Sequence, residues 1–465
     1  MVLKTALNGK VYSFDSLTAA LAKANDEKSG DVLLGRAAET VSERTAAKIV
    51  LANLTLADIY ENPVIPPEKD EVSRVLKEDL NYGVYERIKG WTVGDLRNWI
   101  LDHKTTGEDI RRISRGIESE AAAAVAKLMS AMDLVYGASK ISVSATCATT
   151  VGLPGTLSYR CQPNHPADSI EGIIASICDG VSYGCGDACL GVNPVEDNVE
   201  NTKALMDALW DFMEYWEIPT QNTVLSHVTT QMEALRRGAH CCMLFQSIAG
   251  TQKANEGFGV SAQLLHEAYD LIHRLGQAPG PNLLYFETGQ GSEQSLDADE
   301  GVDLMTLEAR CYGFGRIFKP FMVNNVSGFI GPETLFDGRQ IIRASLEDHF
   351  MGKFLGLPMG MAPCYTNHTK INQDDQEMAT ILLSVAGANY YMGVPVGDDV
   401  MLAYQDTSYH DDACLRELLH KTPAPEFFDW CKRHEILDEI GRLTPCAGDA
   451  SMFTRNNANI IGGRE

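Results

Sequence analysis

The chain has 465 residues, of which 45% are hydrophobic, so it can bury one large core with additions or two to three domains. Its formal charge of −24 at pH 7 argues against nucleic acid as a partner, because a polyanion would be repelled. The N-terminus lacks the pattern of a secretory signal, and no apolar run approaches the roughly 18 residues that a membrane span needs. We therefore expect a cytoplasmic protein with no membrane partner.

The twelve cysteines have irregular spacing. No C-x-x-C pair appears, and Cys185 and Cys189 have no second pair of ligands at a spacing typical of zinc sites. We therefore expect buried free thiols in a reducing compartment, and no metal site.

Residues 1–135 predict a mainly helical N-terminal domain. The stretch DSLTAALAKANDEKSG offers Asp15 or Ser16 as a helix cap and ends at Gly30, as helices often do. A second amphipathic stretch ends at Pro63, and ESEAAAAVAKLMSAMDLVYG (118–137) predicts a helix that leads into the next region.

Between residues 136 and 425, short apolar runs alternate with amphipathic helices. The eight runs are 155–160, 187–193, 223–228, 241–247, 282–287, 320–326, 357–362 and 389–395. Such alternation predicts a parallel sheet covered by helices, and eight repeats favour a closed (β/α)₈ TIM barrel, an α/β fold. Residues 426–465 predict a short C-terminal extension that ends in a flexible polar tail, TRNNANIIGGRE (454–465).

Polar residues stand where the apolar runs stop, and in such a barrel the strand ends form the active-site mouth. They are Arg160 with Gln162, Asn193, His227, Gln246 with Ser247, Glu287, and Asn324 with Asn325. The set contains no lysine for a Schiff base and no His/Asp cluster for a metal-dependent hydrolase. One cation, one anion and several amides suit a small molecule with an ammonium group, held by Glu287, and a hydroxyl group, held by Arg160 and Asn193.

The same residues leave alternatives open. Arg160 and Glu287 could form a purely structural ion pair, Asn193 could simply begin a turn, and His227 could be an ordinary core histidine. Because the set has no evident nucleophile, demanding chemistry at this site would require a cofactor.

Several blocks of the sequence closely resemble the large subunit of adenosylcobalamin-dependent ethanolamine ammonia-lyase. They are GTLSYRCQPN, GVNPVEDNVEN, SHVTTQMEALRRGA, YFETGQGS, GFIGPETLF, RQIIRASLEDHFMGK, CYTNH and GDDVMLAYQ, spread over nearly the whole chain. The resemblance implies a TIM-barrel subunit that holds cobalamin together with a separate small subunit, in a dodecamer of six large and six small chains. The implied reaction converts ethanolamine to acetaldehyde and ammonia through a radical 1,2-amino shift.

The resemblance also assigns roles to individual residues. It implies substrate contacts from Arg160, Gln162, Asn193 and Glu287, with Arg160 and Glu287 as the catalytic groups. It implies cobalamin contacts from Pro194, Gln246, Ser295 and Met401, and it places Ser247 and Phe329 near the substrate and the adenosyl group.

Two positions depart from the family pattern. Ala362 stands where the family has an aspartate on the amino side of the substrate, and Gly257, which follows Glu256, replaces a glutamate near the adenosyl ribose. Loss of one charged hydrogen bond would weaken ammonium binding roughly 10- to 150-fold. Two further hypotheses are therefore the same chemistry on a bulkier or N-substituted amino alcohol, and a non-catalytic homologue that binds an amino alcohol or serves in assembly.

Two further questions concern a short motif and the cellular location. The segment EDHFMGK (347–353) resembles a cobalt-ligating motif, but it begins with Glu347 and falls on a predicted helix, so we interpret His349 as structural. We expect a cytoplasmic location, either free or inside a bacterial microcompartment.

Overall fold

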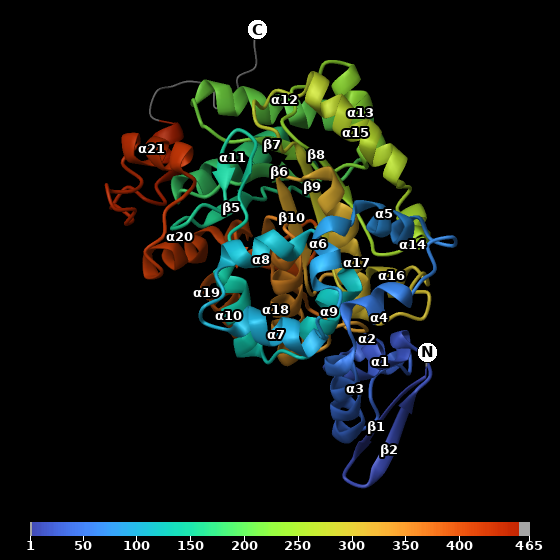
Figure 1. The fold of residues 1–465 in the computed structure, drawn as a ribbon. Helices are drawn as coiled ribbons and strands as arrows, with labels where there is room; N and C mark the ends of the chain where they lie inside the picture. Colours follow the sequence, from blue (N-terminus) through green and yellow to red (C-terminus); the bar gives the residue numbers. More distant parts are fainter. Residues whose placement is uncertain (1, 455–465) are drawn as a thin grey trace.

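Eight parallel strands form the centre of the fold (Figure 1). The structure is a computed structural model that describes residues 2–454, so the predicted tail lies outside the described residues from 455 onward. Each strand overlaps one of the eight predicted runs, which confirms the (β/α)₈ prediction. The strands are β5 (Ser158–Cys161), β6 (Cys189–Val192), β7 (Asn222–Val224), β8 (Leu244–Ser247), β9 (Leu284–Thr288), β10 (Met322–Val326), β11 (Met359–Ala362) and β13 (Tyr390–Val394).

Helices follow the strands and cover the outside of the barrel. The main ones are α11 (Ile170–Ser182), α12 (Val199–Tyr215), α13 (Val228–Arg236), α15 (Ala262–Leu275), α17 (Leu304–Gly315), α18 (Gly338–Phe354), α19 (Gln373–Ala386) and α20 (Tyr409–Leu418). Seven of these eight begin at a Ser, Asn or Asp whose side chain accepts a backbone N–H of the first turn. Such caps satisfy donors that the helix itself cannot, and so fix where each helix starts.

The barrel closes at one seam through side chains. The strand order is β7-β6-β5-β13-β11-β10-β9-β8, and no backbone ladder joins β7 to β8 in residues 2–454. Instead Asn222 exchanges hydrogen bonds with the His240 carbonyl and the Cys242 N–H, both at 2.9 Å. Gln231 exchanges bonds with both backbone groups of Phe245 at 2.8 and 2.9 Å, and the Val228 N–H donates to Oε1 of Gln246 at 3.0 Å. These three carboxamides satisfy the backbone groups that an open edge would expose. We call them the amide seam.

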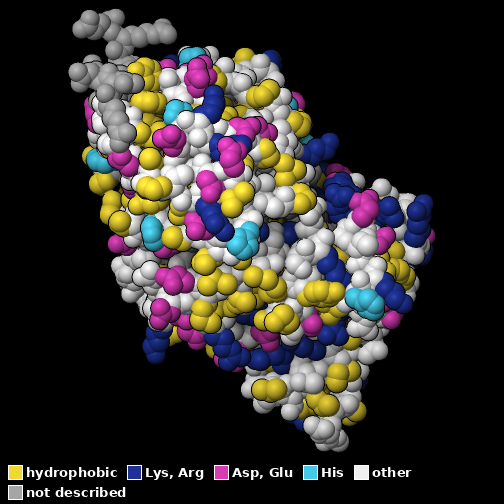
Figure 2. Space-filling view, turned by 90° about the vertical axis from the view of Figure 1, so that its left-hand side faces the viewer, with side chains coloured by type: hydrophobic (Ala, Val, Ile, Leu, Met, Phe, Trp, Pro, Cys, Tyr) yellow, Lys and Arg dark blue, Asp and Glu magenta, His cyan; other side chains and the backbone are white. Residues whose placement is uncertain are grey.

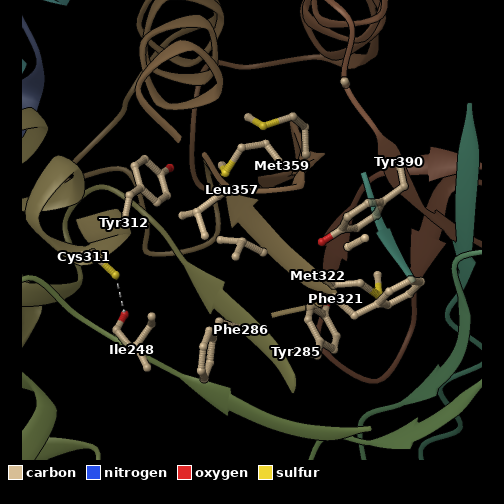
Figure 3. Close-up of a cluster of buried hydrophobic side chains, with 14 of the residues drawn as sticks. Ile248, Tyr285, Phe286, Cys311, Tyr312, Phe321, Met322, Leu357, Met359 and Tyr390 are labelled. Carbon is tan, nitrogen blue, oxygen red and sulfur yellow. Dashed lines mark hydrogen bonds between the residues drawn. The ribbon is translucent and has the colours of Figure 1, made fainter. Parts of the chain in front are cut away.

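Large buried side chains fill the barrel interior and the layer between the strands and the outer helices (Figure 3). Tyr285 on β9 points inward and bonds to Arg160 on β5, whereas Phe286 packs against Phe318 outside the strand. This alternation is the ordinary pleat of a strand. Behind β9, the Cys311 thiol of α17 donates to the Ile248 carbonyl at 3.2 Å. The lower barrel is therefore a packed core, which leaves the strand ends as the place for a site.

The N-terminal region is largely helical, as predicted, but it begins with a hairpin that was not predicted from the sequence. Strands β1 (Leu3–Leu7) and β2 (Lys10–Phe14) are joined by Asn8 and Gly9, both with positive φ (51° and 77°). Asn-Gly is a strong signal for a two-residue hairpin turn. Figure 1 shows this hairpin projecting beside the N-terminus, away from the barrel.

Two helix predictions in this region need correction. Ser16 caps α1 (Leu17–Ala24), but the helix ends before Gly30, which lies in α2 (Ser29–Leu33). The helix predicted at 118–137 is two helices, α9 (Ser119–Lys127) and α10 (Ala131–Lys140), because Ser130 and Asp133 form a capping box that starts a new helix. The others are α3 (Val41–Asn53), α4 (Leu56–Glu61), α5 (Glu71–Asp79), α6 (Tyr82–Ile88), α7 (Val93–Leu101) and α8 (Gly107–Ser114).

A buried arginine joins the N-terminal region to the barrel. Arg310 on α17 is fully buried and donates to Glu120 at 2.6 Å and to Asp70 at 2.8 Å. It also donates to the Ser73 hydroxyl at 2.8 Å and to the Gly250 carbonyl at 2.9 Å. The four acceptors come from α9, the segment at the start of α5, and the loop after β8, so one side chain ties three parts of the chain together.

The predictions from composition also have structural counterparts. The twelve cysteines all lie within the described residues and are free, and ten of them are buried, as expected. No helix in residues 2–454 combines the length and the apolar character that crossing a bilayer requires.

Candidate active site

A cavity of about 310 Å³ opens at the C-terminal ends of the strands. Polar atoms come from Gln162, Asn193, Ser247, Glu287, Thr288 and Tyr404, and apolar walls from Phe245, Phe258, Phe329, Ile330, Met392 and Leu402. A mainly apolar cavity with a few convergent polar groups is the usual form of a small-molecule site. The barrel mouth is also where the sequence predicts the site.

Arg160 lies beneath the cavity and organises its floor. Its Nη1 donates to the Tyr285 hydroxyl at 2.8 Å and to Oε1 of Glu287 at 2.9 Å. Its Nη2 donates to Oδ1 of Asn193 at 2.9 Å and to the Gly191 carbonyl at 3.2 Å. Burial opposes the charge of this guanidinium, but Tyr285 and Glu287 more than compensate, so the pKa of Arg160 is raised and the group stays cationic.

Glu287 faces the cavity while it pairs with Arg160. Its Oε1 accepts both from Arg160 and from the Tyr285 hydroxyl, whereas no described residue donates to Oε2. The side chain is 17% exposed, although Arg160 is fully buried. Glu287 therefore forms the predicted ion pair and retains an unused acceptor next to the cavity, which a purely structural pair does not need.

An amide and carboxylate network forms one wall of the cavity. Nε2 of Gln162 donates to Oδ2 of Asp399 and to the Tyr404 hydroxyl, both at 2.6 Å. Asn164 donates to the same Asp399 oxygen at 2.7 Å and accepts from the Asn193 N–H at 2.7 Å. Sequence reasoning missed Asn164, Asp399 and Tyr404, although all three lie in blocks quoted for the resemblance, YRCQPN and GDDVMLAYQ.

Met392 fills the space between Arg160 and Asn324. Its sulfur lies 2.9 Å from Nη1 of Arg160 and 3.2 Å from Nδ2 of Asn324. A thioether is a weak acceptor on a flexible side chain, so a better acceptor could replace it there. Asn325 points to the other face of β10, where it donates to Asp348 at 3.0 Å, away from the cavity.

The histidines singled out by sequence lie outside the cavity lining. His227 begins α13, and its ring contacts the Thr229 hydroxyl at 2.7 Å and the Phe258 carbonyl at 2.9 Å. His349 is fully buried within α18, where burial lowers its pKa well below the ordinary value. The position of His349 agrees with its structural interpretation, whereas His227 is half-buried at the start of α13 and is not a core histidine.

The residues that the resemblance assigns to cobalamin follow four different strands at the same end of the barrel. Pro194 follows β6, Gln246 and Ser247 end β8, Ser295 ends the short helix α16 (Ser292–Ser295) after β9, and Met401 follows β13. Ser247 lines the cavity, and Ser295 is exposed. The structure thus brings them to one mouth, around the cavity.

The two departures from the family pattern occupy different surroundings. Ala362 is fully buried in a small cluster with Val326, Cys364, Met392 and Tyr404. Gly257 ends α14 (Gln252–Gly257), where an added Cβ would lie 3.4 Å from the side chain of Leu296, an ordinary contact. A side chain could therefore begin at position 257 without displacing its neighbours.

Large apolar side chains are exposed around the mouth. They are Val195 after β6, Leu296 after β9, Phe329 after β10, and Val396 and Val400 after β13. Figure 2 shows further hydrophobic side chains gathered in patches on one side of the molecule. Exposed apolar groups concentrated at one place commonly mark surfaces that a ligand or another protein covers.

Comparison with known proteins gives a consistent family. Residues 12–446 match the model of the family described as ethanolamine ammonia lyase large subunit (EutB). The chain is 50% identical over 453 residues to the ethanolamine ammonia-lyase large subunits of Salmonella typhimurium and of Escherichia coli K12, covering 97% of this chain and all of each relative. Among solved structures, an HMG-CoA lyase from Bacillus subtilis aligns with 65% of this chain and 99% of its own, at 12% identity and a TM-score of 0.37, a likeness too distant to inform function.

Proposed function

Because this chain belongs to the ethanolamine ammonia-lyase large-subunit family, we propose that it converts ethanolamine to acetaldehyde and ammonia by an adenosylcobalamin-dependent radical 1,2-amino shift. Enzymes of this family are carbon–nitrogen lyases. The observation that carries the proposal is the free oxygen of Glu287, which meets the cavity while its other oxygen binds Arg160. An amino alcohol has an ammonium group that Glu287 can bind and a hydroxyl group that Arg160 can bind.

The residues of this chain would bind and polarise the substrate. Oε2 of Glu287 would accept from the ammonium, because an unpartnered carboxylate oxygen beside a cavity favours a cation. The Nη1 donor that now contacts the Met392 sulfur would instead bind the hydroxyl oxygen. Asn193 and Tyr285 would hold the guanidinium in place while it does so. The apolar walls would exclude water from reactive species.

The exposed apolar rim of the mouth supports the binding of adenosylcobalamin there. That cofactor is large and partly apolar, and the exposed valines, Leu296 and Phe329 offer it apolar contacts around an open rim. Pro194, Gln246, Ser247, Ser295 and Met401 would be its nearest partners in this chain. When bound, it supplies the organic radical that removes hydrogen from the hydroxyl-bearing carbon of the substrate.

A small-subunit partner follows from the same proposal. The relatives are named large subunits, and the exposed apolar side chains around the mouth are of the kind that another chain covers. We infer a complex with a separate small subunit, in a dodecamer of six large and six small chains. We also infer a cytoplasmic location, either free or inside a bacterial microcompartment.

Co-expression with the small subunit tests the proposal. The purified complex should release acetaldehyde from ethanolamine when adenosylcobalamin is added, and electron paramagnetic resonance should detect a cobalt(II)–organic radical pair during turnover. Binding of ethanolamine without any radical signal would favour the non-catalytic alternative. A loss of the lyase reaction in Glu287→Gln, but not in Glu333→Gln, would tie it to this cavity, because Glu333 is an exposed acid after β10.

A second candidate substrate has one observation in its favour. Alanine at position 362 removes a family carboxylate, which leaves a bulkier or N-substituted amino alcohol as an alternative. Steady-state assays with ethanolamine, 2-aminopropanol and N-methylethanolamine compare these directly. A clear preference for ethanolamine at ordinary affinity would exclude the alternative.

A further inference from the structure

Asp406 is a buried carboxylate with an unsatisfied oxygen at the end of the barrel. It is 4% exposed, and its Oδ1 accepts from the Thr407 N–H at 2.8 Å. No residue in the described range 2–454 donates a hydrogen bond to its Oδ2. Burying a carboxylate oxygen without a hydrogen-bond donor destabilises the folded chain, so such a residue is a candidate for a functional role.

The strand register places Asp406 beside Ala362. One edge of β13 pairs with β5 along its length, including Gly393 with Cys161. The other edge pairs first with β11, up to Met361 opposite Tyr391, and then with β16 (Thr407–Ser408), where Thr407 is opposite Gly393. Extending each register by one residue brings both Ala362 and Asp406 level with Met392. The same edge of β13 therefore pairs first with β11 and then with β16, and Asp406 lies at the point where the pairing partner changes.

The neighbours of Asp406 are the groups of the candidate active site. The charges that act on it are Arg160, Asp399 and Glu287, and Cys364 and Tyr404 lie close enough to sense its charge. Burial raises the pKa of Asp406 well above its ordinary range, and the Thr407 N–H and Arg160 only partly oppose this. Asp406 lines a second, polar cavity of about 430 Å³, whereas Met392, which is level with it in the strand register, and Tyr404 line the site cavity.

The balance of charge around these groups favours a positively charged guest. Arg160 is the one cation among the four, against the carboxylates of Glu287 and Asp399, and Asp406 resists a further negative charge until a cation is there to balance it. Arg160 is committed to Glu287, and Asp399 is satisfied by Gln162, Asn164 and two backbone N–H groups of its own loop. Among the described residues, Asp406 has one such donor, the Thr407 N–H on its Oδ1. Movement of the flexible Met392 side chain would open the path between it and the cavity.

We propose that Asp406 provides the second carboxylate for the substrate ammonium, replacing from a different strand the acid that the family resemblance leads us to expect at position 362. This deepens the proposed function and rests on it. The substrate then remains an amino alcohol with a charged, hydrogen-bonding nitrogen, and Ala362 is the small residue that leaves room for the Asp406 side chain.

The test uses the complex with the small subunit and adenosylcobalamin, and four variants of this chain. They are Asp406→Asn, Ala362→Asp, the double variant, and Asp398→Asn as a control, since Asp398 is an exposed acid on the same loop. KM for ethanolamine is measured for each, together with the inhibition constant of ethylene glycol, which has no charge. Near- and far-ultraviolet circular dichroism checks folding independently of activity.

Asp406→Asn should raise KM for ethanolamine roughly 10- to 150-fold and leave inhibition by ethylene glycol within about twofold, because a charge-assisted hydrogen bond is lost. The double variant should recover most of the affinity, since it returns a carboxylate from position 362, and Asp398→Asn should behave as the native chain. An unchanged KM in Asp406→Asn, equal losses for both ligands, or no recovery in the double variant would each overturn the inference. No turnover by the native complex would instead overturn the proposed function.

Discussion

The substitution Glu287→Gln should separate recognition of charge from the shape of the site. Glutamine keeps an oxygen that can accept from Arg160 and Tyr285, but it places an amide donor where the free Oε2 now meets the cavity. A charged hydrogen bond contributes about 1.5–3 kcal/mol, so binding of a cationic amine should weaken roughly 10- to 150-fold. A neutral diol should lose little, since its oxygen depends on Arg160. The buried guanidinium also loses its counter-charge, so some loss of stability is expected, limited by Asn193, Gly191 and Tyr285, which still accept from it or contact it.

Isothermal titration calorimetry measures the affinity for ethanolamine and the affinity for ethylene glycol on the same preparation. Glu333→Gln is the matched control, because it removes the same charge from an exposed position at the same end of the barrel. The reasoning would be refuted if Glu287→Gln bound ethanolamine with native affinity. It would also fail if affinity for both ligands fell equally, because that result would indicate a collapsed site.

Two further predictions concern stability. Arg310→Met should lower the free energy of unfolding by about 3–5 kcal/mol, because it leaves Asp70 and Glu120 buried without their cation. Urea unfolding measures this loss. A loss no larger than that of the exposed control Arg74→Met would contradict the prediction. Burial raises the pKa of Glu293 from about 4.5 to about 7. Between these two pH values the folded chain holds a proton that the unfolded chain releases. The free energy of unfolding therefore falls as the pH rises from about 4.5 to about 7. Glu293→Gln should therefore gain up to about 3 kcal/mol relative to the native chain between pH 4 and pH 8, and a difference independent of pH would contradict it.

The barrel was predictable because its signal is repeated. Each buried parallel strand is a short apolar run, and each following helix has its own periodicity, so eight weak patterns support one another. The hairpin at Asn8 and Gly9 was missed for the opposite reason. Its strands are short, half of their residues are exposed and two are buried, so the clearest signal was the Asn-Gly turn.

The candidate site was predictable in part. Arg160, Gln162, Asn193 and Glu287 stand at strand ends, so a parallel barrel had to bring them to one mouth. Asp399 and Asp406 follow the last strand in a segment that returns over the mouth as β14 (Asp398–Asp399), β15 (Tyr404–Gln405) and β16. Where such a segment pairs depends on the register at the end of β13, and no local pattern of residues encodes that register.

The amide seam gives one part of this barrel a different mechanical character. A backbone ladder resists opening as a unit, whereas three separate carboxamides can each be detached by a single substitution or by a competing ligand. Gln246 is the uppermost of the three, and it stands among the residues proposed to meet the cofactor. A ligand that draws the Gln246 oxygen away from the Val228 N–H would weaken the contact between β7 and β8 at the mouth. Binding at the mouth would therefore make the barrel easier to open at this seam.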